Sequence, residues 1–221
     1  MDILKKLPDK SIDLILTDPP YIVDLRGGHG KGCFSKEAKK LKEGLKNIAF
    51  DFDYKTVFEE FLRVCKKPNF YIFCSNAQIS RTMKYFEDLK LNTTLLTWWK
   101  YNACPLVNNN LMPDAEYIIF ARKGVEINNI QATLKSRVIQ MPMQPQDRIH
   151  PTQKPVDLMK RLLLLTSNEN DLVLDCFSGS GTTAIACHRL KRRFICIEKD
   201  PEYWAASVKR LEEEKKQGTL F

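Results

Sequence analysis

The chain contains, at residues 172 to 183, the segment Leu172-Val173-Leu174-Asp175-Cys176-Phe177-Ser178-Gly179-Ser180-Gly181-Thr182-Thr183. An apolar strand here runs into a glycine-rich turn, and a helix is expected to follow from Thr182 to Leu190. The glycines let the backbone approach a ligand closely, and the helix start presents free N–H groups. Glu198 ends the following strand, where an acidic side chain can bind ribose hydroxyls. Since G-x-x-x-x-G-K is absent, this order of elements favours a ligand with a ribose but no triphosphate over a plain tight turn.

Segments typical of strands and of helices alternate along the rest of the chain. Short apolar runs predict strands buried on both faces, as in a parallel sheet, at 12–17, 70–74, 172–174 and 194–197. Amphipathic or apolar stripes predict helices at 56–67, 80–89, 155–167, 182–190 and 201–216. Strands at 93–99 and 116–121 are expected to pair antiparallel, because no crossover helix separates them. The pattern predicts one α/β domain over residues 1–221, with a doubly wound Rossmann-like sheet and an irregular, polar stretch at 122–148.

The composition is that of an ordinary globular chain with an excess of positive charge. Of its 221 residues, 43% are hydrophobic and 28% charged, and the net charge of +8 suits a polyanionic partner such as nucleic acid. The start MDILKKLPDK lacks the apolar core of a signal peptide, and no run reaches the ~18 apolar residues of a membrane helix, so we expect a cytoplasmic protein. The seven cysteines form no C-x-x-C pair and there are three histidines, which argues against a disulfide framework and a metal site.

A second unusual segment, Asp18-Pro19-Pro20-Tyr21, follows the strand at 12–17. The ligand crevice of a doubly wound sheet lies beyond the carboxyl ends of its strands. Since this segment follows such a strand end, we expect it to line the crevice. The Asp18 carboxylate and the Pro19 carbonyl can each accept one hydrogen of an exocyclic amine, whose lone pair then points at an electrophilic methyl group. Pro20 stiffens the segment, and Tyr21 offers a face for stacking a base extruded from a duplex. The alternative is a proline-stiffened loop without chemistry.

Three motifs together resemble the S-adenosylmethionine-dependent DNA amino-methyltransferases. They are Asp18-Pro19-Pro20-Tyr21, Phe177-Ser178-Gly179-Ser180-Gly181 and His150-Pro151-Thr152-Gln153-Lys154-Pro155. The tetrapeptide comes first and the glycine-rich turn last, which is the permuted order of the beta class of this family. The resemblance extends from Leu7 to the helix ending near Lys216, and it implies the methyltransferase form of the Rossmann-like sheet.

The resemblance implies a role for each matching residue. The catalytic residues would be Asp18, Pro19, Pro20 and Tyr21. The cofactor S-adenosylmethionine would be bound by Asp175, Phe177, Gly179, Gly181, Thr183, Glu198, Lys154 and Asp18. Trp99 and Lys100 match a further family segment, although a strand tryptophan is more often part of the core. His150 either stabilises its motif or takes part in catalysis, and no metal is required, because the sulfonium needs no further activation.

The sequence departs from the family in two places. Relatives usually begin with a strand ending in Gly-Asp, just upstream of the part that matches Met1 to Pro8, and that aspartate reaches the adenine of the cofactor. We therefore expect either a sheet that lacks one edge strand and a reduced cofactor affinity, or a natural start further upstream. The segment 123–148, where relatives often insert a target-recognition region, is short, which predicts a short or loose recognition site.

Two segments are expected to contact double-stranded DNA. Residues 24–47 are predicted to form a mobile loop with seven basic and three acidic residues, and its lysines would contact phosphates. The expected DNA-binding residues are Lys36, Lys39, Lys40 and Lys42 of this loop, with Arg137 and Arg148 of the target-recognition segment 123–148. The alternative for the lysines is a solvated helix face.

The preferred activity is methylation of adenine N6 in DNA, in a restriction-modification system or another role. An aspartate at the start of the tetrapeptide goes mostly with adenine in this family, but cytosine N4 uses the same geometry and stays open. RNA or a protein glutamine amide is a weaker alternative from the same fold. A catalytically inactive DNA-binding relative is the alternative from another class, against which the intact Asp18, Tyr21 and Asp175 argue.

The chain ends in Gln217-Gly218-Thr219-Leu220-Phe221, with two apolar residues at a terminus. The pattern Gln-x-x-Leu-Phe is similar to the peptides by which bacterial DNA-processing enzymes bind the replication sliding clamp. The alternative is that Leu220 and Phe221 fold back onto the protein's own sheet. The oligomeric state stays open, with a homodimer as one option.

Overall fold

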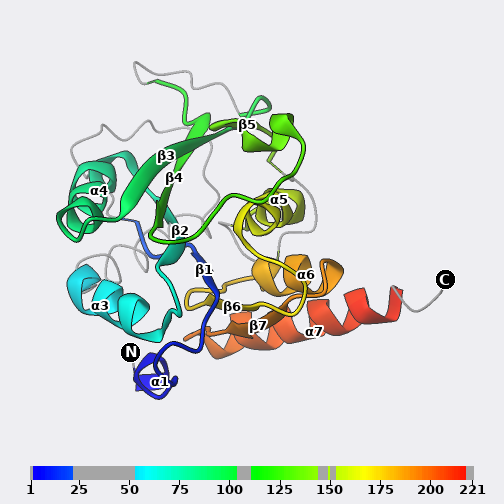
Figure 1. The fold of residues 1–221 in the computed structure, drawn as a ribbon. Helices are drawn as coiled ribbons and strands as arrows, with labels where there is room; N and C mark the ends of the chain where they lie inside the picture. Colours follow the sequence, from blue (N-terminus) through cyan, green and yellow to red (C-terminus); the bar gives the residue numbers. More distant parts are fainter. Residues whose placement is uncertain (1, 22–52, 104–110, 144–148, 150–152, 218–221) are drawn as a thin grey trace.

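The structure is a computed structural model that describes residues 2–21, 53–103, 111–143, 149 and 153–217 (Figure 1). Seven strands of the described chain form one mixed sheet in the order β5-β3-β4-β2-β1-β6-β7. Their bounds are Leu14–Thr17 (β1), Asn69–Cys74 (β2), Asn92–Trp99 (β3), Ala115–Arg122 (β4), Val138–Gln140 (β5), Leu172–Asp175 (β6) and Arg193–Cys196 (β7). The antiparallel pairs are β2 with β4 and β3 with β4, and all other pairs are parallel.

Helices cover both faces of this sheet (Figure 1). Their bounds are Asp2–Lys5 (α1), Tyr54–Val64 (α3), Ile79–Asp88 (α4), Val156–Thr166 (α5), Thr182–Arg189 (α6) and Pro201–Gln217 (α7), with 3₁₀ turns at Asn76–Gln78 (η1) and Ala132–Lys135 (η2). On one face Leu4, Phe61 and Phe86 of α1, α3 and α4 share an apolar cluster with the sheet. On the other face Leu162 of α5 and Ile185 of α6 belong to a second cluster. This confirms the doubly wound α/β arrangement, since two helical layers enclose one sheet.

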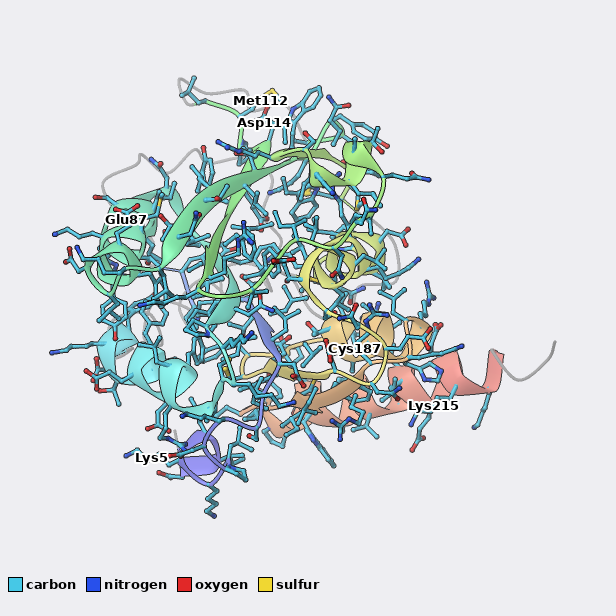
Figure 2. The ribbon with its side chains drawn as sticks, in the orientation of Figure 1. Lys5, Glu87, Met112, Asp114, Cys187 and Lys215 are labelled. Carbon is cyan, nitrogen blue, oxygen red and sulfur yellow. The ribbon has the colours of Figure 1, made fainter. Side chains whose placement is uncertain are left out.

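The expected antiparallel pair is also confirmed, because β3 runs alongside β4 from Asn92↔Arg122 to Trp99↔Ala115. This pairing has a consequence for the crevice. The carboxyl ends of β1, β2, β3, β6 and β7 lie at one end of the sheet, and antiparallel β4 begins there. We call this the carboxyl end of the sheet. In Figure 2, Met112 and Asp114 mark where β4 begins, and Lys5 lies at the opposite end of the molecule.

The expectation of an irregular stretch at 122–148 is wrong where η2 and strand β5 form. Strand β5 pairs parallel with β3 through Thr97↔Val138 and Trp99↔Gln140, and the guanidinium of Arg161 donates to carbonyls of η2. Only the middle residue of β5, Ile139, is buried. Three residues with one buried side chain are too short to show a strand period, and the partner strand is about forty residues away in the sequence. Nowhere in the described residues does a helix have the length and apolar character needed to cross a membrane.

Candidate active site

Asp175, the last residue of β6, joins the two unusual segments of the sequence. Its carboxylate accepts hydrogen bonds from the hydroxyls of Thr17 at 2.8 Å and Thr183 at 2.5 Å, and from the Phe177 N–H at 3.2 Å. Thr17 directly precedes Asp18, and Thr183 lies in the first turn of α6. Burial raises the pKa of Asp175 to about 6, although these three hydrogen bonds act in the opposite direction. One buried carboxylate therefore fixes the tetrapeptide segment against the glycine-rich turn.

The glycine-rich turn is held by its backbone and by helix α7. The Gly179 N–H donates to the Glu198 carboxylate at 2.7 Å. Glu198, the residue predicted to bind the ribose hydroxyls, therefore lies beside the turn. Gly181 has φ +71°, and a Cβ atom there would lie 2.9 Å from the Cβ of Ser207 in α7. A side chain at position 181 is thus excluded both by the left-handed backbone and by the neighbouring helix. Arg210 of α7 donates to the Ser180 carbonyl at 3.0 Å.

Four charged side chains meet where the Asp18 segment leaves β1. The Lys154 ammonium pairs with Asp18 Oδ2 at 2.5 Å and with Glu116 Oε2 at 3.2 Å, and the Lys100 ammonium pairs with Glu116 Oε1 at 2.8 Å. We call Asp18, Lys154, Glu116 and Lys100 the charge network. Because it contains two cations and two anions, it is neutral when all four groups are ionised. Its ion pairs are largely shielded from water, with only 5% of the Lys154 side chain exposed.

Burial and the neighbouring opposite charges shift the pKa values of these groups in opposite directions. Burial raises the pKa of Glu116, but Lys154 and Lys100 outweigh it and lower that pKa to about 2. Burial also lowers the pKa of Lys154, but the two carboxylates outweigh it and raise that pKa. For Asp18, burial is the larger effect and raises the pKa, against the influence of Lys154. Glu116 and Lys154 therefore stay charged near neutral pH, whereas Asp18 is the anion more easily protonated.

Two oxygen atoms of the tetrapeptide have no donor among the described residues. Asp18 Oδ1 is buried and accepts no hydrogen bond, while Oδ2 is occupied by Lys154. No described group donates to the Pro19 carbonyl either, whereas the Pro20 carbonyl accepts from the Tyr54 hydroxyl at 2.6 Å and from Gln78 at 3.3 Å. A buried carboxylate oxygen without a partner is costly, so it indicates a place where a ligand donates. The pair of acceptors lies at the carboxyl end of the sheet.

Tyr21 is attached to the same network. Its hydroxyl donates to Glu116 Oε2 at 3.2 Å, and the Lys154 ammonium lies 5.5 Å from its ring centroid. Burial and the carboxylates of Asp18 and Glu116 raise the pKa of Tyr21, so the phenol stays protonated and remains a donor. The ring is thereby fixed at both its hydroxyl and its face.

The predicted residues are distributed as follows. Lys154, expected near the cofactor, contacts Asp18 directly. Lys100 belongs to the charge network, while Trp99 is 39% exposed and its neighbour Trp98 is the buried core residue. Arg137 is exposed just before β5. The remaining expected residues lie outside the described part: the loop at 24–47 with Lys36, Lys39, Lys40 and Lys42, then Arg148, His150, Leu220, Phe221 and the side chain of Gln217.

Glu116 was not predicted from the sequence, and Lys100 was matched to a family segment without a function. The available signal was the antiparallel pairing, because it places the start of one strand beside the end of the other. A polar residue before the apolar run Tyr117 to Ala121 is thereby brought to the carboxyl end of the sheet. Thr17, Tyr54 and Gln78 were also missed, since their roles depend on contacts across the fold.

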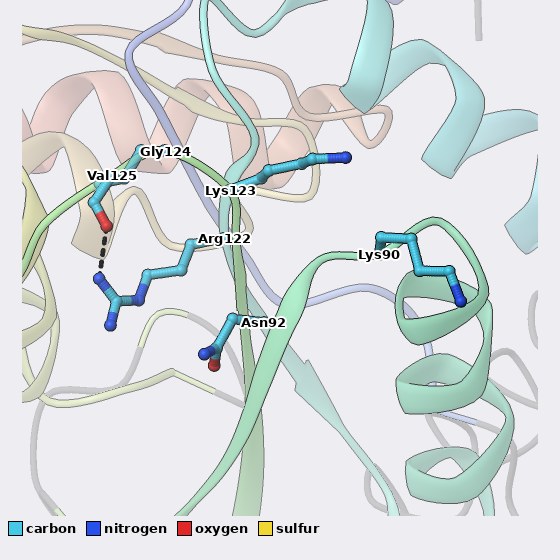
Figure 3. A pocket seen from close by; sticks show the side chains of 6 residues that line it. All are labelled: Lys90, Asn92, Arg122, Lys123, Gly124 and Val125. Atoms are coloured by element: carbon cyan, nitrogen blue, oxygen red, sulfur yellow. Dashed lines mark hydrogen bonds between the residues drawn. The ribbon is translucent and has the colours of Figure 1, made fainter.

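An open hollow of about 320 Å³ lies elsewhere, at the opposite end of the sheet (Figure 3). It is lined by Lys90, Asn92, Arg122, Lys123, Gly124 and Val125. Its Arg122 donates to the Val125 carbonyl. Three cations there give it a positive character, but it shares no residue with the charge network. Within the described ranges no group of His, Cys, Asp and Glu side chains could hold a metal ion.

Comparisons with known proteins find matches that cover most of the chain. A family model described as DNA methylase, N6_N4_Mtase, matches residues 12–209. The chain is 29% identical to the Type II methyltransferase M2.MboI of Moraxella bovis, over 96% of the chain and 85% of that protein. It is 31% identical to the Type II methyltransferase M.HpaI of Haemophilus parainfluenzae, over 96% of the chain and 71% of that protein. The crystal structure of an M1.HpyAVI–SAM complex is similar with a TM-score of 0.70, at 27% identity and 95% coverage of both chains.

Proposed function

This chain belongs to the DNA methylase family whose model spans residues 12–209, and we propose that this DNA methyltransferase acts on the exocyclic N6 of adenine in double-stranded DNA. The observation that carries the proposal is Asp18 Oδ1, a buried acceptor without a partner, followed in the chain by the Pro19 carbonyl, to which no group of the described residues donates. An exocyclic amine has two hydrogens, and these two acceptors match them.

The geometry supports a direct transfer by alignment. The Lys154 ammonium occupies Oδ2, so the Asp18 carboxylate presents Oδ1. With one hydrogen on Oδ1 and the other on the Pro19 carbonyl, the nitrogen lone pair is directed away from both acceptors, toward the electrophile. Tyr21, fixed through its hydroxyl, supplies a flat face for a base rotated out of the duplex. After transfer the nitrogen carries a surplus proton, which the ionised Asp18 carboxylate, already hydrogen-bonded to that nitrogen in this mechanism, can accept.

The cofactor that fits this site is S-adenosylmethionine, with which a similar protein was crystallised. When bound, it supplies a methyl group on a positively charged sulfur. The chain offers carboxylates at Asp18, Asp175 and Glu198 for its cationic and hydroxyl groups, and the start of α6 for its polar end. The residues proposed to hold it are Asp175, Phe177, Gly179, Gly181, Thr183, Glu198, Lys154 and Asp18. Lys154 would serve both the cofactor side and the Asp18 carboxylate.

Adenine is preferred over cytosine because an aspartate begins the tetrapeptide. The test is to incubate unmethylated DNA with the protein and labelled S-adenosylmethionine, digest the DNA, and identify the labelled nucleoside. We expect N6-methyladenine. N4-methylcytosine alone would contradict the choice of base but leave the mechanism intact, and label in neither base would contradict the proposed function.

We propose that two segments of the chain recognise the DNA. Lysines of residues 24–47 would bind phosphates, and the segment 123–148, which includes the exposed Arg137, would contribute to the choice of site. Since the similar curated proteins are named Type II methyltransferases, a role as the modification enzyme of a restriction-modification system is the proposed biological setting. Sequencing that detects modified bases in DNA from expressing cells would identify the recognition sequence.

The C-terminal residues Gln217, Leu220 and Phe221 are proposed to bind the replication sliding clamp, where the apolar pair would fill a pocket and the glutamine would bind its rim. A fluorescence titration with purified clamp tests this. Loss of binding on deletion of Leu220 and Phe221 supports it. Unchanged binding with a lower melting temperature would show that the two residues pack on this protein instead.

Whether the enzyme forms a homodimer is tested by sedimentation in the same buffer.

A further inference from the structure

The geometry points to Glu116 as a positioning residue for methyl transfer, which acts through Lys154 and Tyr21 to hold the Asp18 carboxylate and the stacking ring in place. This inference rests on the proposed function. It concerns a residue that touches neither the base nor the cofactor in the mechanism above. It also gives the buried Lys100 a purpose, because Lys100 fixes Glu116.

A single oxygen of Glu116 holds both partners. Oε2 accepts from the Tyr21 hydroxyl at 3.2 Å and pairs with the Lys154 ammonium at 3.2 Å. The other oxygen, Oε1, pairs with Lys100 at 2.8 Å. The carboxylate therefore ties the aromatic ring to the ammonium that contacts Asp18, and it is itself anchored on its far side.

The anchor belongs to the rigid part of the fold. Glu116 pairs in register with Trp98, and Lys100 directly follows β3. The Lys100 ammonium also donates to the Pro113 carbonyl at 3.3 Å and lies 5.3 Å from the Trp98 ring centroid. Side chains fixed on strands are placed more accurately than side chains on loops. The β3–β4 pair thus fixes the position of the Asp18 segment, which lies beyond the end of β1.

The position of Lys154 determines which oxygen of Asp18 is available. Held between Oδ2 of Asp18 and Oε2 of Glu116, the ammonium leaves Oδ1 without a donor. If the Glu116 charge is removed, the ammonium has one anion fewer to satisfy it and is free to bridge both oxygens of Asp18. The acceptor for the amine would then be occupied, and the Tyr21 hydroxyl would lose its charged acceptor.

Removing that charge also changes the protonation of Asp18. The groups that face Asp18 are Lys154, Glu116, Tyr21, and, from β6 and β2, Asp175 and Cys74. Among them Glu116 is an anion that raises the pKa of Asp18, and Lys154 is a cation that lowers it. Glu116→Gln therefore lowers the pKa of Asp18. Since the proposed transfer uses ionised Asp18, the acid limb of the rate profile moves to lower pH.

The experiment compares three variants of the full chain by single-turnover transfer from labelled S-adenosylmethionine to unmethylated DNA, between pH 5 and 9. Glu116→Gln removes the anchor. Glu116→Gln combined with Lys100→Met also removes the Glu116 carboxylate, but it does not leave the Lys100 ammonium buried without its anion. Glu60→Gln is the matched control, because Glu60 is a similarly shielded carboxylate in an ion pair with Arg63 on α3. Melting temperature and S-adenosylmethionine affinity are measured for each variant.

We expect Glu116→Gln to slow transfer about tenfold to a hundredfold and to move the acid limb to lower pH. The double variant should regain stability but not rate, and Glu60→Gln should keep the parental rate and profile. A double variant that regains rate together with stability, or an unshifted acid limb in Glu116→Gln, would contradict the positioning role. Absence of transfer by the parent protein at every pH would contradict the proposed function itself, and with it this inference.

Discussion

At the scale of single residues, the site depends on buried carboxylates that differ in what they contact. Asp18 has one oxygen paired and one free, Glu116 has both oxygens paired with cations, and Asp175 is surrounded by hydroxyl and N–H donors only. The cations lower the pKa of Glu116 to about 2, whereas burial without a cation raises that of Asp175 to about 6. The free energy needed to ionise a carboxyl group thus differs from one position to the next.

The raised pKa of Asp175 predicts a pH dependence of stability. The folded state holds the proton up to about pH 6, the unfolded state only up to about pH 4. Stability from this group is therefore full below about pH 4 and is lost as the pH rises through 6, by up to about 3 kcal/mol. In Asp175→Asn this loss is absent, so the unfolding free energy of the variant should increase relative to that of the parent between pH 4 and 7. Urea unfolding at both pH values measures it, and a constant difference would contradict the charge assigned to Asp175.

At the scale of elements, the glycine-rich turn is shaped by the helix that packs on it. Gly181 and Gly124 both have a left-handed backbone, with φ of +71° and +67°. A Cβ atom at Gly181 would meet Ser207 Cβ at 2.9 Å, whereas at Gly124 the nearest atom is the Lys67 Cδ at 3.8 Å. A comparison of alanine substitutions at the two positions therefore distinguishes the cost of backbone strain from the cost of crowding against α7.

We expect Gly124→Ala to cost about 1–2 kcal/mol of unfolding free energy, from the backbone alone. Gly181→Ala should cost that amount and about 1–3 kcal/mol more, because α7 must shift. Denaturant unfolding of both variants at one pH measures the difference. Equal losses would mean that α7 does not restrict the turn.

The elements also show what the sequence could predict. The apolar runs and amphipathic stripes located the central strands and the helices that cover them, because burial on both faces or on one leaves a clear periodic pattern. Strand β5 was missed, since its three residues contain one buried side chain. The Asp18 and glycine-rich segments were found from local chemistry, but the charge network was not, because Glu116 and Lys154 meet only through strand pairing and helix packing.

At the scale of the whole molecule, the positive charge is spread over separate regions with different expected roles. The lysines of residues 24–47 are predicted to bind DNA phosphates, while the three cations of the hollow in Figure 3 lie at the end of the sheet away from Asp18. The proposed mechanism holds a base at Asp18, which would bring the duplex to the carboxyl end of the sheet. The hollow should therefore contribute little to the specific complex.

Replacement of Lys39, Lys40 and Lys42 by alanine should flatten the plot of log K for DNA binding against log salt by about one to three units, because fewer counterions are released. The matched control replaces Lys90, Arg122 and Lys123, which removes the same charge from the hollow and should leave the slope close to that of the parent. Fluorescence anisotropy across a salt series measures both. A flatter slope in the control alone would place the DNA at the opposite end of the sheet.

The most direct test of the central claim is methyl transfer by Asp18→Ala, measured in a single turnover with labelled S-adenosylmethionine and unmethylated DNA. Removal of the unpaired acceptor should abolish transfer while DNA affinity stays within severalfold of the parent, since Asp18 contributes alignment of the amine rather than binding of the duplex. Binding of S-adenosylmethionine, followed by calorimetry, shows whether the pocket survives the substitution. Transfer by Asp18→Ala at the parental rate would contradict the mechanism.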